Sequence, residues 1–358
     1  MGEGGIRMLN QEQLARHRKC FEEAISRSIP GVISDISVEE FGCDRTTKPD
    51  WAIGPFRKNE AMTYRKTVQW KDPTNVGWRS GFIFNPSMIE QDGKLYLFYR
   101  AAPKKETLCS RIGLAVYDPE TGWKDYEENP IIFPEEEDEI LSCEDPKIYK
   151  LKGQYVMFYI GVAELPETGE QATLSGMPME VACHVKMAVS KDLLHWEKRG
   201  LVVPVSVSKY WAKSAVIPRN PQGEPVKLNG KYIMYISEGC GGVQYIGLSD
   251  DMLDWSFEPR QFLDVSEFGQ LYEVACAVTD YGAADDALLL DFYYRRPDGR
   301  NGGGQALYSK KEPFRQIELH EGASLSWGGI LRYDGKLTFA QGWDAVDGTE
   351  EMYLYVEE

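Results

Sequence analysis

The chain has 358 residues, a net charge of −16 and a pI near 4.9, and these values exclude several classes of function. Nucleic acids and anionic membranes are poor partners, because neutralising their phosphate groups requires a basic surface. An apolar share of 42% is enough for a large core, and an aromatic share of 12% suits a β-rich fold or a sugar-binding cleft. The composition therefore favours a protein with a neutral ligand.

Signals for membranes, export and metals are weak. The sequence has no run of about 18 apolar residues, as a transmembrane helix would need, and no signal-peptide pattern in MGEGGIRMLNQEQL, so we expect a cytoplasmic protein. The seven cysteines show no CxxC spacing, which favours buried free thiols. The four histidines show no HxH or HExxH spacing, so we expect neither a metal nor a cofactor.

The first predicted element is an amphipathic helix over residues 10–28, where apolar residues recur at helical spacing. Pro30 ends this helix. We expect residues 1–60 to form a helical extension ahead of the main domain. The helix is also a candidate docking element for a homo-oligomer, a state that the sequence leaves open.

The rest of the chain repeats a pattern of two short strands joined by a glycine turn. Three units, NPSMIEQDGKLYLFYRA, DPKIYKLKGQYVMFYIG and WGGILRYDGKLTFAQGWD, start at Asn85, Asp145 and Trp327. A fourth contains LNGKYIMYISEG at 228–239, and a less regular fifth lies at 273–314. A third strand, closing with tryptophan, follows several of these units.

Five such units indicate an all-β fold, a five-bladed β-propeller over residues 61–358. A strand within 61–70 is expected to close the ring. A β-sandwich is the alternative, but the even spacing of the units favours the ring. Because inner strands converge on the axis, the strand starts should face one cavity. These starts are Asn85, Asp145, the Lys213–Ser214 region, Glu273 and Trp327.

The strand starts offer carboxylates, an amide, an ammonium and an indole, a set typical of a sugar site. Glycoside cleavage needs a carboxylic acid at the leaving oxygen and a second group on the other face of the ring. Asp145 is the candidate acid, because the adjacent Glu144 and partial burial would both raise its pKa. From the pattern alone, capping of the turn before Pro146 is an equal alternative.

Several of these motifs together resemble glycoside hydrolase family 130. They are IFNPSMIEQDGKLYLFYRA, SRIGLAVY, CEDPKIYKLKGQYVMFYIG, MAVSKDLLHW and AKSAVIP, and the resemblance spans residues 80–345 of what looks like a divergent member. That family has a five-bladed propeller and contains inverting phosphorylases and hydrolases of β-mannosides. The resemblance implies that Asp145 is the general acid and that Asn85 and Arg100 contact the sugar. It also implies that Asp344, in FAQGWD, holds sugar hydroxyls.

Departures from the family pattern bear on the attacking group. Lys213 corresponds to a lysine that clamps phosphate in the phosphorolytic members, and Arg295 would also suit phosphate. Glu238, in YISEG, and Glu273, in YEVACAV, stand where a phosphate site would want cations or neutral groups. At an effective dielectric near 20, each ionised glutamate would repel one phosphate charge at ~4 Å by about 4 kcal/mol.

We therefore predict an inverting glycoside hydrolase of β-mannosides or related oligosaccharides, with Glu238 or Glu273 activating water. The first alternative is an inverting phosphorylase that uses inorganic phosphate. The second is a non-catalytic sugar-binding propeller, since a propeller by itself implies no activity. The expected substrate contacts are Asn85, Arg100, Glu144, Lys213, Arg295, Trp327 and Asp344.

Two loops carry weaker signals. PEEEDE, at Pro134–Glu139, is expected to be a solvated acidic loop, with a gate near Asp145 as the alternative. GRNGGG, at Gly299–Gly304, is expected to be a flexible turn rather than a phosphate cradle, because no helix or GK[ST] follows it.

Overall fold

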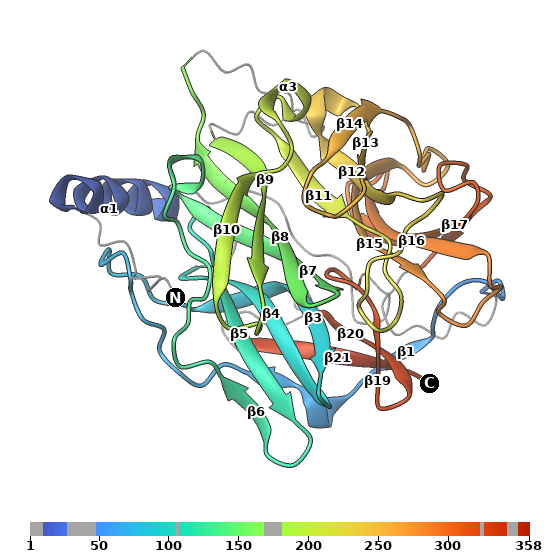
Figure 1. Ribbon diagram of the computed structural model, residues 1–358, viewed down its shortest axis with the longest axis horizontal. Helices are drawn as coiled ribbons and strands as arrows, with labels where there is room; N and C mark the ends of the chain where they lie inside the picture. The colour runs from blue at the N-terminus through green and yellow to red at the C-terminus, as the bar shows by residue number, and fades with distance from the viewer. Residues whose placement is uncertain (1–9, 27–47, 105–106, 168–180, 323–325, 342–349) are drawn as a thin grey trace.

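Five antiparallel sheets are arranged around a common axis in the computed structural model of the protein (Figure 1). This arrangement is the predicted five-bladed β-propeller, and the sandwich alternative is wrong. The structure describes residues 10–26, 48–104, 107–167, 181–322, 326–341 and 350–358.

Each of the first four blades is a run of four consecutive strands, ordered from the innermost to the outermost. Blade I contains β3 (Phe82–Gln91), β4 (Lys94–Ala102), β5 (Arg111–Asp118) and β6 (Gly122–Asp125). Blade II contains β7 (Ser142–Leu151), β8 (Gln154–Glu164), β9 (Val181–Ser190) and β10 (Trp196–Leu201). Blade III contains β11 (Ala212–Val216), β12 (Tyr232–Gly239), β13 (Tyr245–Ser249) and β14 (Ser256–Pro259). Blade IV contains β15 (Gln270–Thr279), β16 (Ala287–Arg295), β17 (Asn301–Ser309) and β18 (Glu318–Glu321).

Blade V joins the two ends of the propeller. It contains β19 (Leu331–Tyr333), β20 (Lys336–Gln341), β21 (Glu351–Glu357) and, as its outer strand, β1 (Phe56–Lys58). A second short strand, β2 (Tyr64–Arg65), also pairs with β21. The predicted strand within 61–70 is β2, and β1 adds an unpredicted closing strand upstream of it, so we propose that the N-terminal extension ends before Phe56 rather than at residue 60.

The middle strands of the blades are buried on both faces, which explains their continuous apolar runs. In β8, every residue from Tyr155 to Ala163 is buried, because neighbouring blades pack against both sides of the sheet. The outer strand β10 instead alternates between partly buried and exposed residues. The glycine-rich segment at 299–304 differs from its prediction, because residues 301–304 belong to β17 and only Gly299 and Arg300 precede it.

A buried arginine ties the blades together near the axis. The Arg219 guanidinium donates to the Ile148 carbonyl at 3.0 Å and to the Met88 and Ile330 carbonyls at 3.4 Å, which belong to blades II, I and V. Gly329 lies so close that a Cβ there would be 2.3 Å from Arg219 Nε. Its φ of +115° also favours glycine, so the chain can wrap around this arginine only with glycine at that position.

The predicted N-terminal helix is α1 (Gln11–Ser26), which lies at the outer edge of the propeller (Figure 1). Its buried side includes Phe21 and Ala24. Arg16 forms an ion pair with Glu137 in the loop before β7. The helix therefore rests on the blade that carries Asp145. A second helix, α3 (Val205–Ser208), is a single turn ahead of β11.

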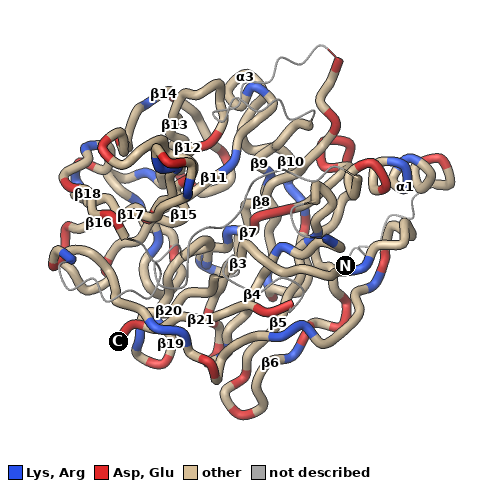
Figure 2. Tube along the Cα trace, turned by 180° about the vertical axis from the view of Figure 1, so that it is seen from behind, with Lys and Arg blue, Asp and Glu red and all other residues tan. Residues whose placement is uncertain are grey.

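Charged residues of both signs are spread over the molecule. Seen from behind, Lys and Arg segments are interspersed with Asp and Glu segments around the propeller (Figure 2).

The six cysteines among the described residues are buried free thiols, as predicted, and Cys43 lies outside them. Among the described helices, none has the length and apolarity needed to cross a membrane.

The acidic loop at Pro134–Glu139 is not simply solvated. Glu139 is fully buried, and its carboxylate binds Lys198, Lys186 at 3.0 Å and the Tyr159 hydroxyl at 2.8 Å. Burial by itself raises the pKa of Glu139, but the two lysines outweigh it and hold that pKa below its ordinary value. The loop is therefore fastened to β8, β9 and β10 just before β7 begins.

Removing the buried carboxylate should destabilise the protein, because Lys186 and Lys198 would lose a partner inside the fold. We expect Glu139→Ala to lower the free energy of unfolding by about 3 kcal/mol, measured by chemical denaturation. The matched control is Glu137→Ala on the same loop, whose exposed ion pair with Arg16 is expected to contribute less than about 1 kcal/mol. Equal losses for the two variants would contradict this account.

Candidate active site

Three inner strands bend at equivalent places beside the axis. Asn85, Asp145 and Ser214 each have a positive φ, of 46°, 52° and 62°. Asn85 and Asp145 also lie where the ladders of β3 and β7 shift register. Such bulges re-aim a side chain out of the regular alternation, and left-handed non-glycine residues are strained. The proline after each of the first two residues helps to fix the bend.

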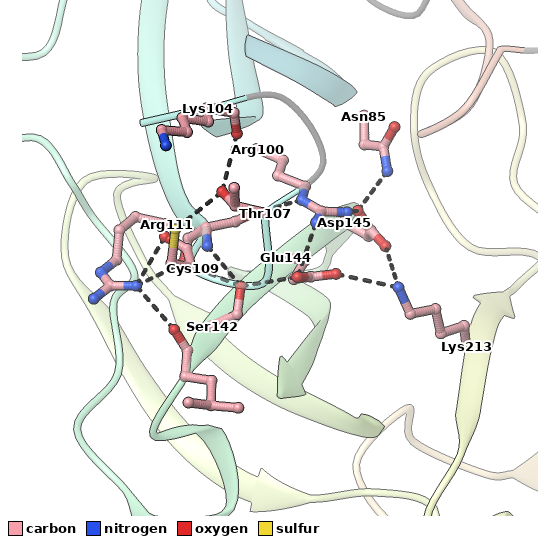
Figure 3. A network of polar contacts seen from close by, with 12 residues as sticks. Asn85, Arg100, Lys104, Thr107, Cys109, Arg111, Ser142, Glu144, Asp145 and Lys213 are labelled. Atoms are coloured by element: carbon pink, nitrogen blue, oxygen red, sulfur yellow. Dashed lines mark hydrogen bonds and ion pairs between the residues drawn. The ribbon is translucent and has the colours of Figure 1, made fainter. Parts of the chain in front are cut away.

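The bends bring five side chains from three blades into contact (Figure 3). The Asp145 carboxylate accepts hydrogen bonds from Asn85 Nδ2 at 2.5 Å and from Arg100 Nη1 at 3.1 Å, and Lys213 Nζ lies 3.6 Å away. Glu144 also accepts hydrogen bonds from both cations, at 2.9 Å from Arg100 Nη2 and 3.1 Å from Lys213 Nζ. We call these five residues the Asp145 cluster.

Glu144, a predicted substrate contact, is fully enclosed in this cluster, and its contact with substrate stays a prediction. No part of its side chain is exposed, and Ser142 Oγ donates to it at 2.8 Å in addition to the two cations. Because it is fully enclosed, it can affect a ligand through Arg100, Lys213 and Asp145. We therefore interpret Glu144 as the group that orients the two cations.

The expected rise in the pKa of Asp145 is wrong for the free protein. Burial by itself raises that pKa, but Arg100 and Lys213 outweigh it, so the pKa lies below the ordinary value of an aspartate. The free protein therefore holds Asp145 as a carboxylate.

Glu238 and Glu273 lie beside this cluster, on neighbouring blades. The backbone N–H of Val274, next to Glu273, donates at 2.9 Å to Oγ of Ser237, next to Glu238. Both glutamates are buried; the charge of Asp145 acts on both of them, and the charge of Glu238 acts on Glu273. The structure thus brings together the three predicted catalytic carboxyls, although their roles remain predictions.

The two glutamates differ in how they are held. Glu238 is directly opposite Lys213 across β11 and β12, and Trp211 Nε1 donates to it at 3.3 Å. Gly239 makes this approach possible, since a Cβ there would lie 1.9 Å from the Trp211 carbonyl oxygen. No described residue donates a hydrogen bond to the carboxyl group of Glu273, whose backbone pairs with Tyr293 in the sheet.

Burial dominates the proton affinity of both glutamates. It raises the pKa of Glu238 to about 7, opposed by Lys213, and that of Glu273 to about 8, opposed by Lys147. Near neutral pH both groups therefore hold a proton for part of the time. The predicted repulsion of phosphate assumed two ionised glutamates, so that argument against phosphate is weaker than the sequence suggested.

The remaining predicted contacts have different positions. Trp327 is buried, and its ring packs on Tyr293 with 5.4 Å between ring centroids. Arg295 is exposed at the end of β16 and lies outside the Asp145 cluster. Asp344 lies outside the described residues. Contacts of Trp327, Arg295 and Asp344 with substrate stay predictions.

Sequence reasoning missed Lys147, two residues after Asp145. Its side chain is buried, and its ammonium donates to the carbonyls of Ala275 at 2.9 Å and Trp327 at 2.7 Å. The charges of Asp145 and Glu273 act on it. Lys147 is visible in the sequence as the last residue of the EDPK motif. The bulge at Asp145 breaks the regular alternation of the strand, so the sequence does not predict on which face of the sheet Lys147 lies.

The one carboxylate group among the described residues with metal-like spacing is already filled by a cation. Glu136, Asp138 and Glu139 each bring an oxygen within 4.8 Å of the others. Lys186 Nζ forms ion pairs with all three. An ammonium thus neutralises this group, which lies in the loop before β7 and not in the Asp145 cluster.

Solved structures share this fold. One, from a study of the GH130 family of mannoside phosphorylases that describes hydrolases targeting β-1,2-mannosidic linkages in Candida mannan, aligns with a TM-score of 0.65 at 19% identity, covering 87% of this chain and 95% of that one. A glycosyl hydrolase from Bacteroides ovatus aligns with a TM-score of 0.62 at 20% identity, covering 87% and 95%. The β-1,2-mannobiose phosphorylase of Listeria innocua aligns with a TM-score of 0.55 at 15% identity, covering 82% and 96%. The chain thus shares its overall fold with these structures.

The sequence places the chain more narrowly. The model of glycoside hydrolase family 130, described as β-1,4-mannooligosaccharide phosphorylase, matches residues 56–275, which is more than half of the chain. The chain therefore belongs to glycoside hydrolase family 130, as its motifs predicted.

Two curated relatives from Thermoanaerobacter sp. (strain X514) match parts of the chain. A 1,2-β-oligomannan phosphorylase is 28% identical over 183 residues, 50% of this chain and 53% of that protein. A β-1,2-mannobiose phosphorylase is 26% identical over 169 residues, 44% of this chain and 48% of that protein. The matches thus span about half the length of these relatives.

The buried glutamates should make stability depend on pH. Glu273 has an ordinary pKa of 4.5 and a folded pKa of about 8, so folding disfavours its ionised form. Stability from this group is present below 4.5 and falls as pH rises through 8. We expect Glu273→Gln to melt at the same temperature as the unchanged protein near pH 4.5 and a few degrees higher at pH 8.5, where ~1 kcal/mol corresponds to about 2–4 °C.

Differential scanning calorimetry at several pH values measures this difference. The matched control is Glu258→Gln on β14, whose side chain is half exposed and pairs with Arg260. That variant should melt with the unchanged protein at every pH. A constant difference between Glu273→Gln and the unchanged protein across this range would show that ionisation of Glu273 does not destabilise the fold.

Proposed function

We propose that this protein cleaves β-mannosidic bonds with inversion, with Asp145 as the proton donor and water as the attacking group. The observation that carries the proposal is the grouping of three buried carboxyls, in which Glu238 and Glu273 lie on hydrogen-bonded neighbouring strands and the charge of Asp145 acts on both. Inverting glycosidases need one carboxylic acid and one carboxylate base on opposite faces of the sugar. Family membership supplies the mannoside class.

The proton needed by Asp145 can come from the glutamates. In the free protein Asp145 is ionised, whereas Glu238 and Glu273, with pKa values of about 7 and 8, hold protons near neutral pH. A bound sugar would exclude water from Asp145, and desolvation raises the pKa of a carboxyl. Transfer of one proton from a glutamate to Asp145 would then prepare the acid and the base together.

The chemical step returns the site to its starting state. Asp145 gives its proton to the glycosidic oxygen as the bond to the anomeric carbon breaks. A water molecule attacks that carbon from the opposite face, and the ionised glutamate takes a proton from the water. Asp145 ends as a carboxylate and the glutamate ends protonated, which are the forms that the free protein favours.

Phosphorolysis is the second candidate function, and the names of the relatives favour it over hydrolysis. Both curated relatives and the family model are described as phosphorylases. Protonated glutamates would tolerate phosphate, and Lys213 would attract it. Against this, the cations of the Asp145 cluster are already bound by Glu144 and Asp145, which leaves little uncompensated positive charge for a dianion.

Phosphate dependence separates the two reactions. We expect the protein to release mannose from β-1,2- or β-1,4-mannobiose at the same rate with and without inorganic phosphate. Glu238→Gln or Glu273→Gln, whichever removes the base, should lower kcat by about 10²–10⁴-fold. Product chromatography measures both, with Glu258→Gln as the control.

Formation of mannose 1-phosphate only when phosphate is present would contradict hydrolysis and establish phosphorolysis instead. Binding of mannobiose without turnover in either condition would favour a sugar-binding propeller.

A further inference from the structure

We propose that Lys147 is a positioning residue that makes Glu273, rather than Glu238, the base of this site, an inference that rests on the proposed hydrolysis. Lys147 lies on β7 two residues after Asp145, and its side chain reaches across the axis to blades IV and V. It is 4% exposed, so its charge acts in a setting where water screens little.

The ammonium of Lys147 fixes the backbone that carries Glu273. It donates to the carbonyl of Ala275, two residues after Glu273 on β15, at 2.9 Å. It also donates to the carbonyl of Trp327, ahead of β19, at 2.7 Å. An ammonium has three N–H donors, so Lys147 has one more for a carboxylate or a bound ligand. The lysine thus joins the strand of the acid, the strand of Glu273 and the segment of Trp327.

The surroundings of the two glutamates distinguish their roles. Glu238 is held by the Trp211 indole and paired across the strands with Lys213, which also binds Asp145. Glu273 is 4% exposed, and its carboxyl group receives no hydrogen bond from a described residue. A general base must leave its lone pairs for water. Glu273 meets that requirement, and Lys147 supplies the positive charge that favours its carboxylate.

The charges that face Glu273 come from four packed strands. Burial raises the pKa of Glu273 to about 8, Lys147 is the largest influence that lowers it, Glu238 and Asp145 raise it, and Lys213 lowers it. Glu273 in turn raises the pKa of the Tyr293 hydroxyl on β16, whose pKa burial already raises. These facing groups are Lys147 and Asp145 on β7, Lys213 on β11, Glu238 on β12 and Tyr293 on β16.

A purely structural lysine would behave differently from a positioning one. If Lys147 only joined three blades, its loss would lower stability and reduce kcat equally at every pH. If it favours the ionised form of Glu273, its loss should raise the pH at which Glu273 loses its proton. In the free protein the site carries its one proton on Glu273 while Asp145 is ionised, so loss of the Glu273 proton sets the basic limb of kcat/KM, and that limb would then move to higher pH.

Titration of Glu273 tests the inference without turnover. The carboxyl signal of ¹³C-glutamate-labelled full-length protein is followed against pH, and the signal lost in Glu273→Gln identifies Glu273. We expect Lys147→Met to raise the midpoint by at least one pH unit, and Lys147→Arg to return it to within half a unit of the unchanged protein. The matched control is Lys150→Met, on the same strand, which should leave the midpoint unchanged.

Should Lys147→Met fail to fold, Lys147→Gln provides the same comparison, since its side chain keeps a hydrogen-bond donor but has no charge. An unchanged midpoint in a folded, uncharged variant overturns the inference. So does a shifted midpoint that is matched by Lys150→Met.

The outcomes also separate this inference from the proposed function. An unshifted midpoint in a protein that hydrolyses mannobiose overturns the assignment of Lys147 alone. A shifted midpoint in a protein that forms only mannose 1-phosphate overturns the proposed hydrolysis, and with it the base role of Glu273. A shifted midpoint together with hydrolysis, and a basic limb of kcat/KM displaced to higher pH in Lys147→Met, supports both.

Discussion

The ion pairs between two cations and two adjacent carboxylates determine how this site works. Arg100 and Lys213, from blades I and III, hold both Glu144 and Asp145 on blade II. Isolated buried charges are costly, so each of the four groups depends on the others. This mutual dependence fixes where three blades meet and keeps Asp145 ionised while no sugar is bound. The bulges at Asn85 and Asp145, where φ is positive, turn these side chains toward the ion pairs.

Glu238 and Glu273 differ from Asp145 in their proton affinity, because burial raises their pKa values with less compensation from cations. Asp145 has two cations in contact and loses its proton easily, whereas Glu238 and Glu273 lack that degree of compensation and keep theirs. An acid and a base whose proton affinities are reversed in the free protein need one proton transfer before reaction. In our proposal a bound sugar causes this transfer, which would limit wasteful chemistry in its absence. The lysines at positions 147 and 213 then set how easily the proton moves.

The fold was largely predictable, because the strand–glycine turn–strand units recur with even spacing and only a propeller places their starts together. The position of Asp145 followed from the same repeat. The closing strand β1 was missed, since its three residues carry too little pattern to stand out from the segment around them. The sign of the pKa shift of Asp145 and the buried role of Lys147 were also not predictable. Both depend on contacts between blades, which no local pattern encodes, and Glu139 was misjudged for the same reason.

The most direct test of the central claim is the dependence of Asp145 variants on the leaving group. An acid is needed only where the leaving oxygen must be protonated. We expect Asp145→Asn to lose about 10³-fold or more in kcat/KM on mannobiose and to retain most of its rate on 2,4-dinitrophenyl β-mannoside, whose leaving group departs without a proton. Equal losses on both substrates would contradict the role of Asp145 as the proton donor and would leave it only the structural part in the ion-pair cluster.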